Sequence, residues 1–84
     1  MQLIESMDRL PEGQSGRVAS VDADPHMRRR LLDLGLVPGA RVTCQGRSPA
    51  GDPAAYLIWG AVVALRAKDA AGVVLERPAG PEEA

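Results

Sequence analysis

The sequence predicts a mainly β domain with one helix, arranged as a small five-stranded barrel of antiparallel character. Three observations lead to this prediction. Five short segments have the apolar patterns of strands, one longer segment has the spacing of an amphipathic helix, and the connections between them are short. The length of 84 residues fits one domain.

The N-terminal part predicts a helical turn followed by a strand. Ser6 can cap a single turn that Pro11 ends. Residues 17–21 then form the first strand. Val18 and Val21 have opposite parity, so they cannot both face inward on a regular strand. A bulge, or one outward valine, is therefore expected here.

The helix is expected over residues 25–34, covering one opening of the barrel. Asp24 is a good N-cap, and Pro25 occupies the first helical position, where its missing N–H costs nothing. Three apolar residues at i, i+4 and i+7 form a stripe for the core. They are Met27, Leu31 and Leu34.

The end of the helix has the residues of a Schellman motif. Gly35 supplies the left-handed position just past the helix, which lets Leu36 fold back onto Leu31. Pro38 and Gly39 then occupy the central positions of a type II turn. These residues predict a sharp reversal of the chain before the next strand.

Beyond this turn the apolar period changes to two. The remaining strands are expected over residues 41–45, 54–59, 62–66 and 73–77. Residues 48–53 form a loop, and residues 68–72 form a short turn or a single helical turn. Gly60 and Ala61 fit a two-residue hairpin turn of type II′, which would pair Trp59 with Val62.

This hairpin has apolar residues on both faces. The inner face would carry Tyr56, Ile58, Val63 and Leu65. The outer face would carry Leu57, Trp59, Val62 and Ala64, with Arg66 at the rim. One interpretation is that the N-terminal segment or the helix covers the outer face. The other is a surface for partner docking or self-association, because a tryptophan with an arginine rim is a typical anchor.

Arg28, Arg29 and Arg30 form the one cluster of like charges. Arg29 and Asp33 stand at i, i+4 and can pair weakly. The cluster is either a solvated helix face or a surface for an acidic partner or a phosphate. RNA is a weaker alternative, because no aromatic residues are interleaved with the arginines.

Metal binding and catalysis find little support in the sequence. His26 and Cys44 are the only imidazole and thiol groups, with Asp22 and Asp24 near His26. Cys44 is expected in the core. No nucleophile, base and orienting group can be matched by spacing, so we expect neither an enzyme nor an intrinsic cofactor, and Fe(II) would bind weakly.

Composition narrows the function classes further. Ten Lys and Arg residues stand against eleven Asp and Glu, which disfavours nucleic-acid binding. One cysteine excludes an internal disulfide. We expect no signal peptide, no membrane insertion, a cytoplasmic location, a domain over residues 1–77 and a disordered acidic tail over residues 78–84.

Several of these motifs together resemble the FeoA family. Residues 29–39 read R-x-L-x-x-L-G-x-x-P-G, residues 48–53 read SPAGDP, and residues 64–66 read ALR. The resemblance extends over about residues 5 to 77. The residues that carry it are Leu31, Leu34, Gly35, Leu36, Pro38, Gly39, Asp52, Pro53, Gly60 and Leu65.

The resemblance implies an SH3-like barrel that binds and regulates FeoB, the membrane transporter of ferrous iron, and so supports Fe(II) uptake. The same domain ends the metal-dependent repressors of the DtxR type. The expected partner-binding residues are Leu57, Trp59, Val62, Arg66, Arg28 and Arg29. A homo-oligomer, an Fe(II)-binding sensor or chaperone, and a small RNA-binding barrel remain as alternatives.

Overall fold

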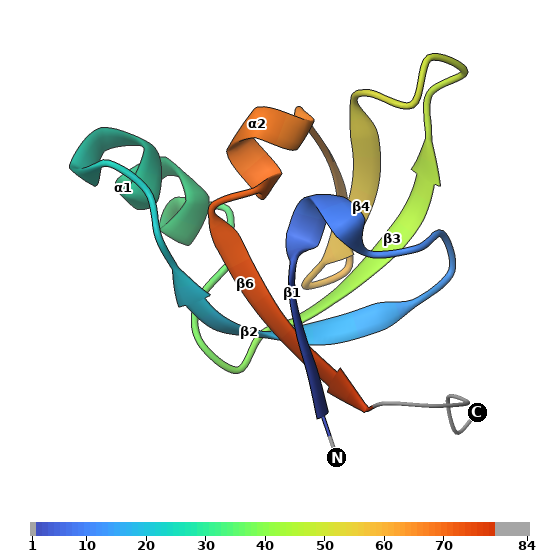
Figure 1. The fold of residues 1–84 in the computed structure, drawn as a ribbon. Helices are drawn as coiled ribbons and strands as arrows, with labels where there is room; N and C mark the ends of the chain where they lie inside the picture. Colours follow the sequence, from blue (N-terminus) through green and yellow to red (C-terminus); the bar gives the residue numbers. More distant parts are fainter. Residues whose placement is uncertain (1, 79–84) are drawn as a thin grey trace.

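Six antiparallel strands in one sheet make up most of the fold (Figure 1). The computed structural model describes residues 2–78. In chain order the strands are β1 (Gln2–Ser6), β2 (Ser15–Val21), β3 (Arg41–Arg47), β4 (Ala54–Ile58), β5 (Ala61–Leu65) and β6 (Val73–Pro78). Within residues 2–78 their order across the sheet is β1-β6-β2-β3-β4-β5, so β1 and β5 are its edges and this part of the chain does not close the sheet.

The mainly β architecture with one principal helix is confirmed, but the described residues form six strands rather than five. The additional strand, β1, pairs with β6 along its whole length. Its two adjacent apolar residues, Leu3 and Ile4, are both exposed, so they lack the alternation that signals a strand. Ser6 ends this strand, and its side chain makes no capping bond to the 3₁₀ turn η1 (Met7–Arg9).

The bulge predicted in β2 is present. The pairing of β2 with β6 shifts register between Val18 and Ser20. The extra residue brings Val18 and Val21 to the same side, and both are buried.

Helix α1 (Pro25–Asp33) begins where the sequence predicts. The Asp24 carboxylate accepts hydrogen bonds from the backbone N–H groups of His26 at 3.1 Å and Met27 at 3.0 Å. Leu31 is buried, but Leu34 is 37% exposed. The prediction that Leu34 faces the core was therefore wrong, because the helix ends at Asp33 and the chain turns at once.

The chain reversal after α1 is confirmed. Gly35 has a φ of 101°, and the Leu36 N–H donates to the Leu31 carbonyl at 3.2 Å, as in a Schellman ending. Gly39 has a φ of 90°, and the Ala40 N–H donates to the carbonyl of Val37 at 2.9 Å. Leu36 is thereby delivered into the core, where it is fully buried.

The turn between β4 and β5 differs from the prediction. Trp59 and Gly60 are the two turn residues, with φ values of 51° and 80°, which corresponds to type I′ rather than type II′. Ile58 pairs with Ala61, so each residue of β4 lies two positions from its predicted partner. A shift of two positions keeps every side chain on its predicted face, because the strand period is two.

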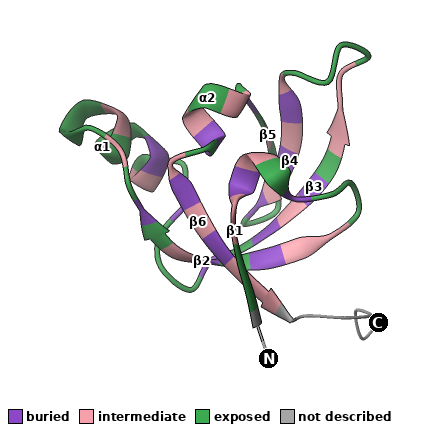
Figure 2. Cartoon of the chain, viewed as in Figure 1, coloured by how far each residue is buried: buried purple, intermediate pink, exposed green. Residues whose placement is uncertain are grey.

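The core lies on the concave side of the sheet, against α1, η1 and the short helix α2 (Ala67–Ala70) (Figure 2). Its largest buried side chains come from every layer: Tyr56, Met7, Leu10, Leu31, Leu36, Ile58 and Leu75. Cys44 is fully buried, as predicted. The expected acidic tail lies outside the described residues, apart from the backbone of Pro78.

Candidate docking surface

The outer face of the β4–β5 hairpin carries an exposed apolar patch. We define the hairpin patch as Leu57, Trp59 and Val62. Trp59 is 72% exposed and Val62 is 64% exposed, while Leu57 is half-buried. Arg66 is exposed and follows β5, at the end of the hairpin away from Trp59, so its place at the rim of the patch stays a prediction. Within residues 2–78, the N-terminal segment and the helix therefore leave Trp59 and Val62 mostly uncovered.

The indole of Trp59 is held in one place. Its Nε1–H donates to the backbone carbonyl of Gly35 at 2.8 Å, which links the hairpin to the end of α1. A Cβ on Gly35 would overlap the indole Cδ1 and lie 2.9 Å from Nε1. Gly35 therefore serves two purposes: it adopts the left-handed conformation that ends the helix, and it leaves room for the indole.

The backbone of Trp59 is in an unfavourable region. Among residues 2–78 it is the one non-glycine residue with a positive φ. The first position of a type I′ turn favours Asn, Asp or Gly, because other side chains clash in the left-handed region. Stability alone would select a small polar residue here. Backbone strain combined with an exposed anchor side chain is typical of a functional position.

Two further apolar residues extend this surface. Leu34 and Val37 are 37% and 38% exposed and flank the Gly35–Leu36 reversal on which the indole rests. Arg41 is exposed and begins β3, and the next residue, Val42, pairs with Ile58, which precedes Trp59. The exposed apolar surface thus extends from the hairpin to the end of α1.

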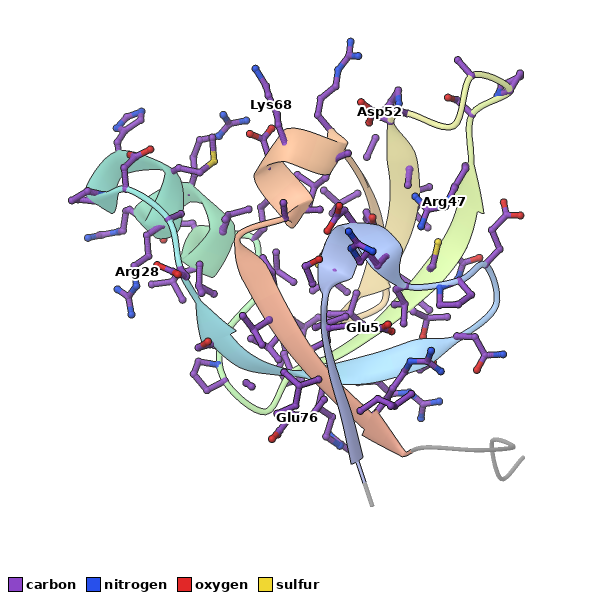
Figure 3. All side chains as sticks on the ribbon, viewed as in Figure 1. Glu5, Arg28, Arg47, Asp52, Lys68 and Glu76 are labelled. Atoms are coloured by element: carbon purple, nitrogen blue, oxygen red, sulfur yellow. The ribbon has the colours of Figure 1, made fainter. Side chains whose placement is uncertain are left out.

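The second candidate surface is the arginine face of α1. The Arg28 Nε donates to the Val21 carbonyl at 3.4 Å, and the Arg29 Nε lies 3.5 Å from an oxygen of Asp33 (Figure 3). The pair is highly exposed and contributes little to stability. Arg28 and Arg29 also line a shallow groove of about 390 Å³ with Ala23, Pro25 and Leu32.

The residues of the SPAGDP loop have a structural role that spacing did not reveal. The Asp52 carboxylate accepts a hydrogen bond from the Ala67 N–H at 2.8 Å, across fifteen positions of the chain (Figure 3). This bond satisfies a free N–H at the start of α2. The preceding Arg66 gives no side-chain cap of its own. Asp52 therefore connects the β3–β4 loop to α2.

Arg47 has no signal in the sequence, yet it ties β3 to the N-terminal turn. Its Nη2 donates to the carbonyls of Asp8 at 2.9 Å and Leu10 at 2.8 Å. Beside it, the Tyr56 hydroxyl donates to the Met7 carbonyl at 3.3 Å. Burial raises the pKa of Tyr56, and the nearby Arg47 charge opposes that rise. This cluster orders η1 over the core.

Metal-ligating residues do not converge within residues 2–78. His26 is exposed on the first turn of α1, whereas Cys44 is buried on β3. No group of three or more His, Cys, Asp or Glu side chains in this part of the chain could hold a metal ion. Neither described helix is long and apolar enough to cross a bilayer.

The comparison with known proteins identifies the fold. The FeoA protein of Chlorobium tepidum is 38% identical, with a TM-score of 0.81 over 92% of this chain and 73% of that one. The zinc-complexed FeoA of Stenotrophomonas maltophilia, described as an SH3-domain protein, is 30% identical, with a TM-score of 0.76 over 86% and 94%. The SH3-like fold is thus confirmed.

A more distant neighbour shares the fold alone. A manganese-dependent transcriptional repressor is 22% identical, with a TM-score of 0.78, over 89% of this chain and 42% of that one. No curated protein sequence matches the chain. The FeoA domain model matches residues 5–77. The chain therefore belongs to the FeoA family, whose role is that of an accessory factor in ferrous iron transport.

Proposed function

We propose that this protein is a cytoplasmic regulator that binds the cytoplasmic part of a FeoB-type transporter and thereby supports Fe(II) uptake. Membership of the FeoA family supports the link to ferrous iron transport. The Stenotrophomonas maltophilia relative is named as a candidate activating factor of that process. FeoA and SH3-like domains are accessory or regulatory domains, so the proposal assigns binding rather than catalysis to this chain.

One observation carries the choice of surface. Trp59 is 72% exposed, is fixed by its bond to Gly35 and occupies a backbone conformation that tryptophan disfavours. A rigid aromatic side chain loses little conformational entropy when a partner covers it, which is why tryptophan anchors many interfaces. The hairpin patch is therefore the docking surface in this proposal.

The surroundings of the patch define the chemistry of the partner surface. Arg41, next to the β3 partner of Ile58, and Arg66, just past β5, are both exposed, so in this proposal they favour a partner with an apolar centre and carboxylates at its edge. The arginines would raise the association rate, and the apolar centre would hold the complex. Arg28 and Arg29 on α1 are the alternative contact in this proposal, since both are exposed.

Regulation follows from unequal affinity. The transporter alternates between nucleotide or gating states, and a bound partner shifts their populations only by the ratio of its affinities for them. Docking through the hairpin patch would favour one transporter state over the other under one condition. In the disfavoured state, the apolar part of the transporter surface and its acidic edge would lie too far apart to contact this chain together. The effect on uptake would then be a population shift and would need no chemistry on this chain.

Capture from native membranes tests the proposal. Tagged wild-type protein is incubated with membranes that contain the transporter, in the presence of Fe(II) and a guanine nucleotide. Two folded variants accompany it: Trp59→Asn, and a triple exchange of Arg28, Arg29 and Arg30 to Glu. We expect wild type and the triple variant to capture the transporter and Trp59→Asn to lose it.

Asparagine is chosen so that loss of the indole can be separated from loss of the hairpin turn. Asparagine favours the left-handed turn position, so this variant keeps the hairpin while it removes the anchor. Loss of capture in the triple variant alone would move the docking surface to α1. No capture by the wild type would contradict the proposal.

An Fe(II)-binding module is the second candidate, because the Stenotrophomonas maltophilia FeoA structure contains zinc. Residues 2–78 offer no cluster of three ligands to support it. An anaerobic Fe(II) titration tests this candidate function. A dissociation constant larger than about 1 mM would exclude it.

A further inference from the structure

The free edge of β5 is open and uncharged. Among residues 2–78, β5 has a strand partner on one side only, namely β4. Its sequence AVVAL contains no charged residue and no proline. Ala61, Val62 and Ala64 are exposed. Proteins usually protect such edges with lysine, proline, a bulge or a covering segment, and the described part of this chain places none of these on β5.

The hairpin geometry fixes which backbone groups face outward. In a two-residue hairpin, the pair that closes the turn exchanges both hydrogen bonds, and here that pair is Ile58 and Ala61. The direction in which the backbone N–H and C=O groups point alternates from one residue to the next along the strand. The N–H and C=O groups of Val62 and Ala64 therefore point away from β4, toward the free edge.

The other edge of the sheet is better protected. β1 carries Glu5, which forms an ion pair with Arg77 at 2.6 Å (Figure 3). A second chain that approached this edge would have to accommodate that charged pair. The two edges thus differ, and β5 is the one suited to strand addition.

We propose that a second copy of this chain pairs with β5, antiparallel to it, about a two-fold axis through Val63. This register sets Val62 opposite Ala64 of the second copy, and Ala64 opposite its Val62. All four outward groups of each β5 then find partners, which gives four hydrogen bonds between the chains. Centring the axis on Val62 or Ala64 would leave part of each strand unpaired.

Self-complementarity favours a second copy over another protein. In this register apolar residues face apolar residues, and Arg66 falls opposite Gly60 rather than opposite another arginine. The two sheets join into one, so the hairpin patches of both copies come onto one continuous outer face. The inference goes beyond the proposed function, because it concerns the purified protein without any transporter.

Sedimentation of the purified chain over a range of concentrations tests the dimer. We expect a concentration-dependent dimer in the wild type. Val62→Lys should raise the dissociation constant at least about tenfold, because the two new lysines become diagonal neighbours on one face and lysine blocks edge pairing. Ile4→Lys is the matched control, since it introduces the same side chain at the other edge and should leave the dimer unchanged.

A backbone variant tests the hydrogen bonds directly. Ala64→Pro removes one donor per chain from the interface and none from the β4 ladder. The dissociation constant should rise about tenfold to a hundredfold. Circular dichroism confirms that each variant remains folded.

Cross-linking tests the register and does not depend on those variants. Val63→Cys should form a disulfide-linked dimer on mild oxidation, because the two Cα atoms meet at the axis. Val62→Cys should not, since its partner position is Ala64. The native thiol, Cys44, is buried. A wild type that stays monomeric up to about 1 mM, or a dimer that Ile4→Lys disrupts and Val62→Lys does not, would overturn the inference.

Discussion

Replacing Gly35 by Ala tests the physical link between the end of α1 and Trp59. The left-handed backbone at a φ of 101° costs an alanine about 1.5 kcal/mol. The new Cβ also overlaps the indole, which must move away. The indole is 72% exposed, so roughly 60 Å² is buried and its displacement costs about 1.5 kcal/mol. The total loss of stability is about 3 kcal/mol.

Urea denaturation of Gly35→Ala, Trp59→Asn and the double variant measures the two contributions separately. With Trp59 already replaced, the Gly35 exchange should cost only the backbone contribution, about 1.5 kcal/mol. A coupling energy of about 1.5 kcal/mol is therefore expected. Strict additivity would refute the reasoning, because it would mean that the indole does not rest on Gly35.

Three further results are expected. Burial raises the pKa of Tyr56, so its contribution to the free energy of unfolding should be fully present below pH 10 and be lost above it, as the unfolded state ionises first. Tyr56→Phe should remove this loss and cost about 1 kcal/mol for the lost bond to Met7, as urea titrations at pH 8 to 11 can show. Asp52→Ala should cost about 1 kcal/mol and speed amide exchange at Ala67. Leu31→Ala should cost about 2–5 kcal/mol in urea melts, since Leu31 is fully packed.

Patterns among neighbouring residues were sufficient to predict much of the fold. The cap at Asp24, the glycine ending at Gly35 and the type II turn at Gly39 each depend on neighbouring residues, and each was predicted. The bulge in β2 followed from the parity of Val18 and Val21. In all these cases a steric rule acts within a few residues.

The errors arose where contacts between distant parts of the chain, or an unusual backbone conformation, determine the structure. Strand β1 exists through its pairing with β6, 68 to 76 positions away, and its own pattern does not reveal it. The hairpin turn was misplaced because Trp59 occupies a position where turn rules favour asparagine. The turn rules failed there because a tryptophan adopts the left-handed conformation, with its indole bonded to the Gly35 carbonyl.

The candidate site was predictable in part. Parity along the β4–β5 hairpin placed Trp59 and Val62 on the outer face, and they are exposed. The contact of the indole with Gly35 could not be inferred, because it joins segments 24 positions apart. Arg47 likewise gives no local signal, since its partners are backbone carbonyls of the N-terminal turn.

The most direct test of the central claim is the affinity of the purified chain for the isolated cytoplasmic part of the transporter. Wild type and Trp59→Asn are compared by calorimetry, after urea melts show that both are folded. Loss of a central tryptophan anchor should weaken binding at least about thirtyfold, equal to about 2 kcal/mol. Equal affinities of the two proteins would contradict docking through the hairpin patch.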